Sequence, residues 1–245
     1  MGTLSVPGEL LVERDPMHVA RQASARIAES LRKASVSRVA TLALSGGNTP
    51  RETYHLLAHE PAIDWTKICI YWVDERAVAP TDDRSNYRWA KATLLDVARV
   101  PVELVHRMPA DRPEREGAAR DYEALLREKV PAGRDGTPTL DVVVLGVGDD
   151  GHTASLFPAE ATVDIRDRWV VAVPGAAQRE PRLTLTAPIL QAAEKVFVLA
   201  VGSNKRVALD RVFREEGDLH ATPARLLRSA RGKTTWLVDE AAAGR

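Results

Sequence analysis

The chain has 245 residues, with 34 basic and 34 acidic side chains and 44% hydrophobic residues. This length suits one α/β domain over residues 1–245, and the balanced charge argues against a nucleic-acid partner. No stretch approaches the roughly 18 apolar residues of a membrane span, so we expect no membrane partner. Cys69 is the one cysteine, which suits a reducing compartment. Because the first ten residues lack a basic region followed by an apolar stretch, we expect a cytoplasmic protein.

Apolar runs alternate with helical patterns along the chain. In chain order, the sequence predicts a helix at 16–33, a strand at 40–44, a helix at 50–58, a strand at 68–73, helices at 87–95 and 113–129, strands at 140–145 and 169–173, a helix at 188–195, a strand at 196–201, helices at 205–214 and 223–228, and a strand at 235–238. Several strands are apolar throughout, as in a parallel sheet covered on both faces. The pattern predicts a doubly wound α/β fold, in which ligands bind beyond the carboxyl ends of the strands.

The first strand runs into a glycine-rich loop, SGGNTP, at residues 45–50. We expect Thr49 to cap the next helix, with Glu52 completing a capping box. Free backbone N–H groups and the helix dipole at such a helix start favour an anion, although a tight, well-capped turn without a ligand is the alternative. The candidate anion-binding residues are Gly46, Gly47, Asn48 and Thr49.

The second loop carries a run of charges directly after the apolar strand at 68–73, namely Asp74, Glu75 and Arg76. A helix follows, with Ser85 or Asn86 as its cap. The charged residues alone are as compatible with a surface salt-bridge cluster as with a functional site.

The third loop, GVGDDGHTASLFP at 146–158, contains a literal G-x-G-x-x-G pattern. A dinucleotide site would need a helix after the glycines and an acid at the end of the next strand. Pro158 leaves little room for that helix, and the next strand ends in Pro174 without an acid. We therefore expect the glycines to expose Asp150 and His152, because histidine is well suited to proton transfer near neutral pH. A structural histidine is the alternative.

Two further basic residues are candidates for binding an anion, and metal ligands are scarce. Lys205 lies at a predicted helix start, where the dipole disfavours a cation unless an anion binds there. Together with Arg182 and the first loop, it would form a phosphate clamp. Asp150 and His152 have no third ligand nearby, so we expect neither a metal nor a redox cofactor.

Six motifs, taken together, resemble the 6-phosphogluconolactonase family, within a wider group that includes glucosamine-6-phosphate deaminase. They span residues 45 to 205 in the order of the family, and the long histidine motif combined with VDER is specific. The motifs are SGGNTP at 45–50, VDER at 73–76, SNY at 85–87, GVGDDGHTASLFP at 146–158, PRLTLT at 181–186 and VGSNK at 201–205.

The resemblance implies an open, Rossmann-like α/β fold with a mostly parallel sheet and helices on both faces. It also implies hydrolysis of 6-phospho-D-glucono-1,5-lactone to 6-phosphogluconate, the second step of the oxidative pentose phosphate pathway, without a metal. In the family the proton-transfer residue corresponds to His152, and the phosphate contacts correspond to the glycine-rich loop, Arg182 and Lys205. Arg76 lines the same cleft. The expected protein is a monomer or a weak homo-oligomer whose partner is the small sugar-phosphate lactone.

Some readings stay open at this point. Asn48 stands where the family more often has serine, which puts that side-chain contact in doubt. Asp150 either orients His152 or binds a sugar hydroxyl. A sugar-phosphate isomerase or deaminase, with Asp74 as the base and His152 opening the ring, is the alternative enzyme. Against it, Phe157 stands where the deaminases have a glutamate. A catalytically silent sugar-phosphate-binding regulator is the alternative outside enzymes.

Overall fold

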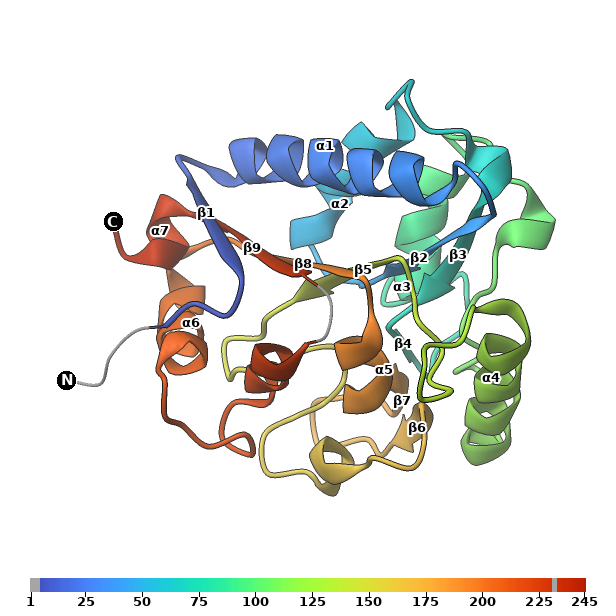
Figure 1. Ribbon diagram of the computed structural model, residues 1–245. Coiled ribbons are helices and arrows are strands. Elements are labelled where there is room, and N and C mark those ends of the chain that lie inside the picture. Colours follow the sequence, from blue (N-terminus) through green and yellow to red (C-terminus); the bar gives the residue numbers. More distant parts are fainter. Residues whose placement is uncertain (1–4, 231–232) are drawn as a thin grey trace.

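The computed structural model describes residues 5–230 and 233–245 (Figure 1). The strands are β1 (Glu9–Glu13), β2 (Ala40–Leu44), β3 (Ile68–Trp72), β4 (Asp74–Arg76), β5 (Val142–Gly146), β6 (Val170–Val173), β7 (Arg182–Leu185), β8 (Lys195–Ala200) and β9 (Lys233–Asp239). The α-helices are α1 (Pro16–Ala34), α2 (Thr49–Ala58), α3 (Asn86–Ala90), α4 (Arg115–Lys129), α5 (Ala187–Ala192), α6 (Arg206–Phe213) and α7 (Glu240–Ala243). In this part of the chain, no helix is both long and apolar enough to cross a membrane.

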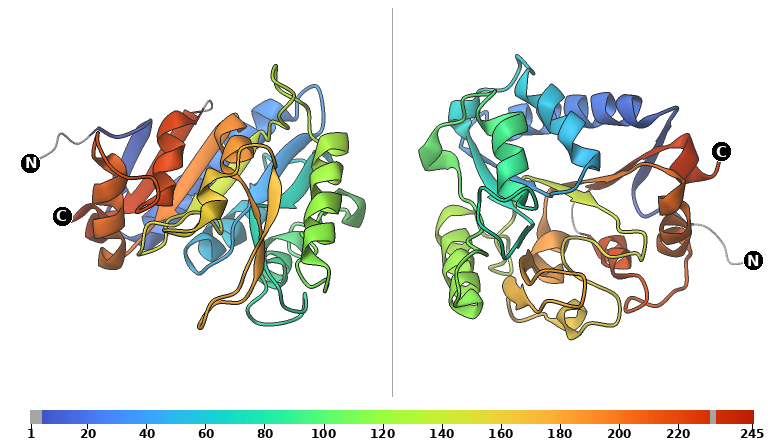
Figure 2. Two further views of the ribbon diagram at one scale, coloured as in Figure 1. Left: turned by 90° about the horizontal axis from the view of Figure 1, so that it is seen from below. Right: turned by 180° about the vertical axis from the view of Figure 1, so that it is seen from behind.

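Six strands form a parallel sheet in the order β1-β9-β8-β5-β2-β3. A second sheet, β4-β7-β6, is antiparallel. The hairpin of β6 and β7 projects to one side of the large sheet in the view from below (Figure 2). The prediction of a mostly parallel α/β sheet is confirmed. The predicted strand at 169–173 exists as β6, but it belongs to the small sheet.

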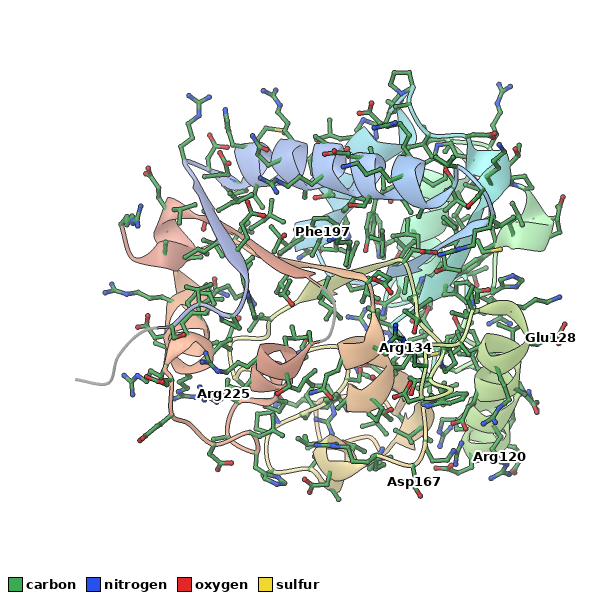
Figure 3. The ribbon with its side chains drawn as sticks, viewed as in Figure 1. Arg120, Glu128, Arg134, Asp167, Phe197 and Arg225 are labelled. Carbon is green, nitrogen blue, oxygen red and sulfur yellow. The ribbon has the colours of Figure 1, made fainter. Side chains whose placement is uncertain are left out.

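Helices cover both faces of the large sheet, as predicted. Phe197 of β8 lies beneath α1 (Figure 3), while Trp236 of β9 points to the other face and meets Phe213 of α6, with ring centroids 5.2 Å apart. Both residues are at least nine-tenths buried. The alternation of side chains along a strand thus supplies an apolar surface to each helical layer.

Several element boundaries differ from those predicted, each for a local reason. The prediction of a capping box at Thr49 is wrong, because α2 already includes Thr49. Asn48 before it has helical backbone angles and makes no capping bond. The helix predicted at 188–195 ends at Ala192, since Lys195 begins β8. The segment at 223–228 is a 3₁₀ helix, Pro223–Ser229. The helix at 87–95 consists of α3 and a π-helical turn, Lys91–Leu95. Ser85 caps α3 as expected, accepting from the Arg88 N–H at 3.2 Å.

Asp141, just before β5, ties β5 to β2. Its buried carboxylate accepts from the Thr41 N–H and hydroxyl, both at 2.9 Å, and pairs with Arg38. The Thr41 hydroxyl in turn accepts from the Asp141 N–H at 2.8 Å. Because β2 and β5 carry the first and third loops, this contact helps to fix the two loops relative to each other.

We expect Asp141→Ala to lower the free energy of unfolding by about 3 kcal/mol, because it leaves two buried Thr41 donors without an acceptor. Urea unfolding would measure the loss. Asp121→Ala is the matched control: its carboxylate pairs with Arg112 at the surface, at 2.6 Å, and its loss should cost less than about 1 kcal/mol. Equal costs for the two variants would contradict the role given to Asp141.

Candidate active site

The carboxyl ends of β2, β3, β5 and β8 open into one cleft of about 440 Å³. Both sheets contribute side chains to it. The structure brings nine of the ten predicted site residues to its lining, and Asp150 lies just behind them. The nine are Gly46, Gly47, Asn48, Thr49, Asp74, Arg76, His152, Arg182 and Lys205.

The glycine-rich loop is shaped to leave its backbone free. Gly47 has a φ of 95°, in the region that favours glycine, and a Cβ at Gly46 would overlap the Asn86 side chain. Tyr54 of α2 anchors the loop: its hydroxyl accepts from the Ser45 N–H at 3.0 Å and donates to the Ser45 carbonyl at 2.9 Å. No described residue accepts a hydrogen bond from the backbone N–H groups of residues 46–48. These donors are therefore available to an anion.

His152 is held by Asp150 two residues before it. One Asp150 oxygen lies 2.7 Å from His152 Nδ1 and accepts from the His152 backbone N–H at 3.0 Å. Burial raises the pKa of Asp150, but hydrogen bonds from His152 outweigh this effect and bring it to about 2. A carboxylate only accepts, so Nδ1 carries the proton, and Nε2 of the neutral ring is left as a base.

Gly148 makes room for this pair. Its N–H donates to the His152 carbonyl at 2.8 Å, and its carbonyl accepts from the Gly151 N–H at 2.9 Å, so the loop folds back on itself. A Cβ at Gly148 would overlap His152 Nδ1 and lie 2.6 Å from Asp150 Oδ1. From behind, the Ala224 N–H donates to the Gly151 carbonyl at 2.9 Å.

Asp74 is a buried carboxylate at the junction of the two sheets. It accepts from the Ser155 hydroxyl at 2.6 Å and from the Asn86 amide at 3.0 Å. Arg182 of β7, two residues before the register partner of Asp74, lies 3.6 Å from the same carboxylate. The two contacts with Asn86 and Ser155 were not predicted from the sequence, although both residues fall within the quoted motifs.

Glu75 is part of the frame, not of the cleft lining. Its carboxylate is buried and accepts from the N–H groups of Arg76, Asn86 and Tyr87, at 2.7–2.9 Å, and from the Ser85 hydroxyl at 3.0 Å. Burial raises the pKa of Glu75 more than the hydrogen bonds from the three N–H groups lower it. Of the charged triplet, only Asp74 and Arg76 face the cleft.

Lys205 lies at the β8 side of the cleft, in a 3₁₀ turn, Ser203–Lys205, that leads into α6. Its ammonium pairs with Asp149, which also accepts from the Asn204 amide at 2.9 Å. The hydrogen bond from Lys205 lowers the pKa of Asp149. The residue next to Asp150 thus belongs to a second charged pair, which the sequence did not predict.

The chain is similar to several proteins of known name. A family model described as glucosamine-6-phosphate isomerases/6-phosphogluconolactonase matches residues 14–236. A 6-phosphogluconolactonase from Synechocystis sp. is 37% identical over 96% of this chain and 93% of its own length. One from Streptomyces coelicolor is 36% identical with the same coverage. The solved 6-phosphogluconolactonase from Trypanosoma brucei matches with a TM-score of 0.87 at 27% identity, over 99% of each chain.

The fold and the named relatives identify an α/β enzyme with a cleft beyond the carboxyl edge of its parallel sheet. More particularly, the chain belongs to the glucosamine-6-phosphate isomerase/6-phosphogluconolactonase family. The resemblance inferred from the six motifs is confirmed. A monomeric glucosamine-6-phosphate deaminase, 19% identical with a TM-score of 0.81, shares the fold. Fold alone therefore does not separate the two activities.

Gly148→Ala should break the bond between His152 and Asp150, because the added methyl group takes the space of Nδ1. Nitrogen–proton NMR correlations of the imidazole at pH 8 should show the Nδ1–H tautomer in the parent protein and its loss in the variant. Gly117→Ala in α4 is the control, since its Cβ would meet nothing closer than 3.8 Å. A folded Gly148→Ala protein that keeps the Nδ1–H tautomer would refute this account of the loop.

Proposed function

We propose that this protein is a carboxylic ester hydrolase that converts 6-phospho-D-glucono-1,5-lactone to 6-phosphogluconate, in the oxidative pentose phosphate pathway. The observation that carries the proposal is the oriented His152–Asp150 pair in a cleft that also presents free backbone donors and several cations. The names of relatives that are 36–37% identical over nearly the whole chain support the same activity. We also propose a cytoplasmic, single-domain protein, monomeric or weakly self-associating, with the lactone as its partner.

The phosphate is bound by the glycine-rich loop together with Lys205 and Arg182. The loop offers N–H groups at the start of α2, where the helix dipole adds a favourable field. Lys205 lines the cleft, about four-fifths of its side chain is buried, and its ammonium pairs with Asp149. Arg182 lines the cleft and lies 3.6 Å from the Asp74 carboxylate, and its planar guanidinium suits a phosphate. These contacts place the sugar ring before His152.

Hydrolysis needs one group that first removes and then returns a proton. Neutral His152 takes a proton from water through Nε2 as the water oxygen bonds to C1 of the lactone. The tetrahedral intermediate collapses, the bond from C1 to the ring oxygen breaks, and the imidazolium returns the proton to that oxygen. The product is the open-chain acid. Asp150 orients the ring through its 2.7 Å contact with Nδ1, which supports the orienting role over a contact with a sugar hydroxyl. Candidate donors for the oxyanion are Arg76 and backbone N–H groups.

Asp74 is better placed to hold Arg182 than to remove a carbon-bound proton. A deaminase or isomerase would use a carboxylate as a base here, but this one accepts bonds from Ser155 and Asn86 and faces a cation. The geometry therefore favours the lactonase over the alternative enzyme.

His152→Ala should lower kcat by about 10²- to 10⁴-fold and leave the affinity for 6-phosphogluconate nearly unchanged, because the phosphate contacts remain. The rate is measured with lactone generated in situ, after subtraction of its spontaneous hydrolysis. His220→Ala is a matched control, since His220 also pairs with an aspartate, Asp164 at 3.2 Å, but lies outside the cleft lining. Parental turnover by folded His152→Ala would show that His152 is structural.

Metal independence and reaction class can be tested together. After exhaustive chelation the protein should still hydrolyse 6-phosphogluconolactone, and it should release no ammonia from glucosamine 6-phosphate. Asp74→Asn should reduce lactone hydrolysis less than His152→Ala does, whereas a deaminase would lose its base. Ammonia release at a comparable rate would favour the deaminase. Activity restored only by added zinc would favour a metallohydrolase.

A further inference from the structure

The chain turns back on itself directly after His152. The Leu156 N–H donates to the Thr153 carbonyl at 3.0 Å, and these two residues form an antiparallel bridge. His152 and Phe157 flank this turn and therefore lie side by side. Their ring centroids are 4.7 Å apart, with the ring planes inclined by 45°. This separation is typical of a favourable contact between aromatic rings. The histidine loop thus supplies both the imidazole and a ring that packs against it.

The turn that joins the two rings is fixed at its tip. The Ser155 N–H donates to the Thr184 hydroxyl of β7 at 3.0 Å. The Ser155 hydroxyl donates to the buried Asp74 carboxylate at 2.6 Å. Because both partners belong to the small sheet, that sheet holds the turn and with it the position of Phe157 relative to His152.

Phe157 is also held by a cation from the hairpin of β6 and β7. Arg179 Cζ lies 3.7 Å from the centroid of the Phe157 ring, within the range of a cation–π contact. Arg179 is itself fixed, because its guanidinium pairs with Glu160 and its backbone exchanges two hydrogen bonds with Ala176, at 2.9 and 3.1 Å. Phe157 is only 6% exposed. A ring packed in this way has little freedom to move.

The contact with Asp150 leaves one motion of the His152 ring open. It restrains Nδ1 alone, so the imidazole can still tilt about that atom, and 31% of the side chain is exposed. A second ring packed beside the imidazole opposes this tilt by steric contact. Nε2 lies across the imidazole from Nδ1 and moves with the tilt. The contact with Phe157 therefore bears on the atom that the proposed reaction uses.

We propose that Phe157 is a positioning residue for His152, whose ring keeps Nε2 of the imidazole pointing in one direction within the cleft. The inference rests on the proposed function, in which Nε2 removes and returns a proton. Phe157 lies outside the cleft lining, so it acts on the reaction through His152 and not through the substrate. Displacement of a reacting group by about 1 Å costs roughly 100-fold in rate, which sets the scale of the expected effect.

Steady-state kinetics of Phe157→Leu test this role. The substitution removes the ring but keeps an apolar side chain, so kcat should fall by about 10- to 100-fold while KM changes less than about twofold. Phe213→Leu is the matched control, because Phe213 of α6 packs against the ring of Trp236 outside the cleft lining. It should keep the parental kcat. In a His152→Ala background, Phe157→Leu should cause no further loss, since the group that it positions is gone.

Carbon-13 relaxation of labelled histidine side chains measures the same role without turnover. The His152 signal is assigned by its absence from His152→Ala. Its order parameter should be lower in Phe157→Leu than in the parent protein, and it should be unchanged in Phe213→Leu.

Three results would overturn the proposal: parental kcat in folded Phe157→Leu, an equal further loss in the His152→Ala background, or an imidazole as rigid in Phe157→Leu as in the parent protein. The last result would do so even if kcat fell. Failure of the parent protein to hydrolyse the lactone would refute the proposed function alone, because the relaxation measurement still decides whether Phe157 positions the imidazole.

Discussion

The cleft depends on one residue at which the chain passes from one sheet to the other. The Val73 N–H donates to the Leu44 carbonyl of β2 at 2.9 Å, and its carbonyl accepts from the Leu185 N–H of β7 at 2.8 Å. The backbone of Val73 therefore joins the edge of the large sheet to the small sheet. The next residue, Asp74, is consequently placed at the junction, where Arg182 can approach it from β7.

Two of the predicted cleft residues are each restrained by a neighbour that lies outside the cleft lining. Asp150 restrains His152, and Asp149 restrains Lys205, so two consecutive aspartates hold an imidazole and an ammonium. Such restraint lowers the entropic cost of ordering long side chains when a ligand binds.

The sequence predicted the parts of the fold whose signals are local. The apolar runs at β2 and β3 and the amphipathic pattern of α1 were located to within a residue or two, because burial on both faces leaves a continuous hydrophobic run. The polar strand β4 and the half-polar strand β7 carry no such signal and exist through their pairing with each other. The glycine and histidine loops could be predicted because their signals are also local. The contact of Asp74 with Ser155, 81 residues away, could not.

The order of the strands has a consequence for synthesis of the chain. The first strand, β1, lies at the edge of the large sheet and pairs with the last, β9. In this pairing Glu9 lies opposite Thr235, and Glu13 lies opposite Asp239. During translation β1 therefore leaves the ribosome long before its partner, and it waits unpaired while the cleft-bearing strands emerge. Closure of the sheet at β1 becomes a late, long-range step, and non-local pairing of this kind slows folding. An N-terminal segment of this chain is exposed to proteases and chaperones until the final strand arrives.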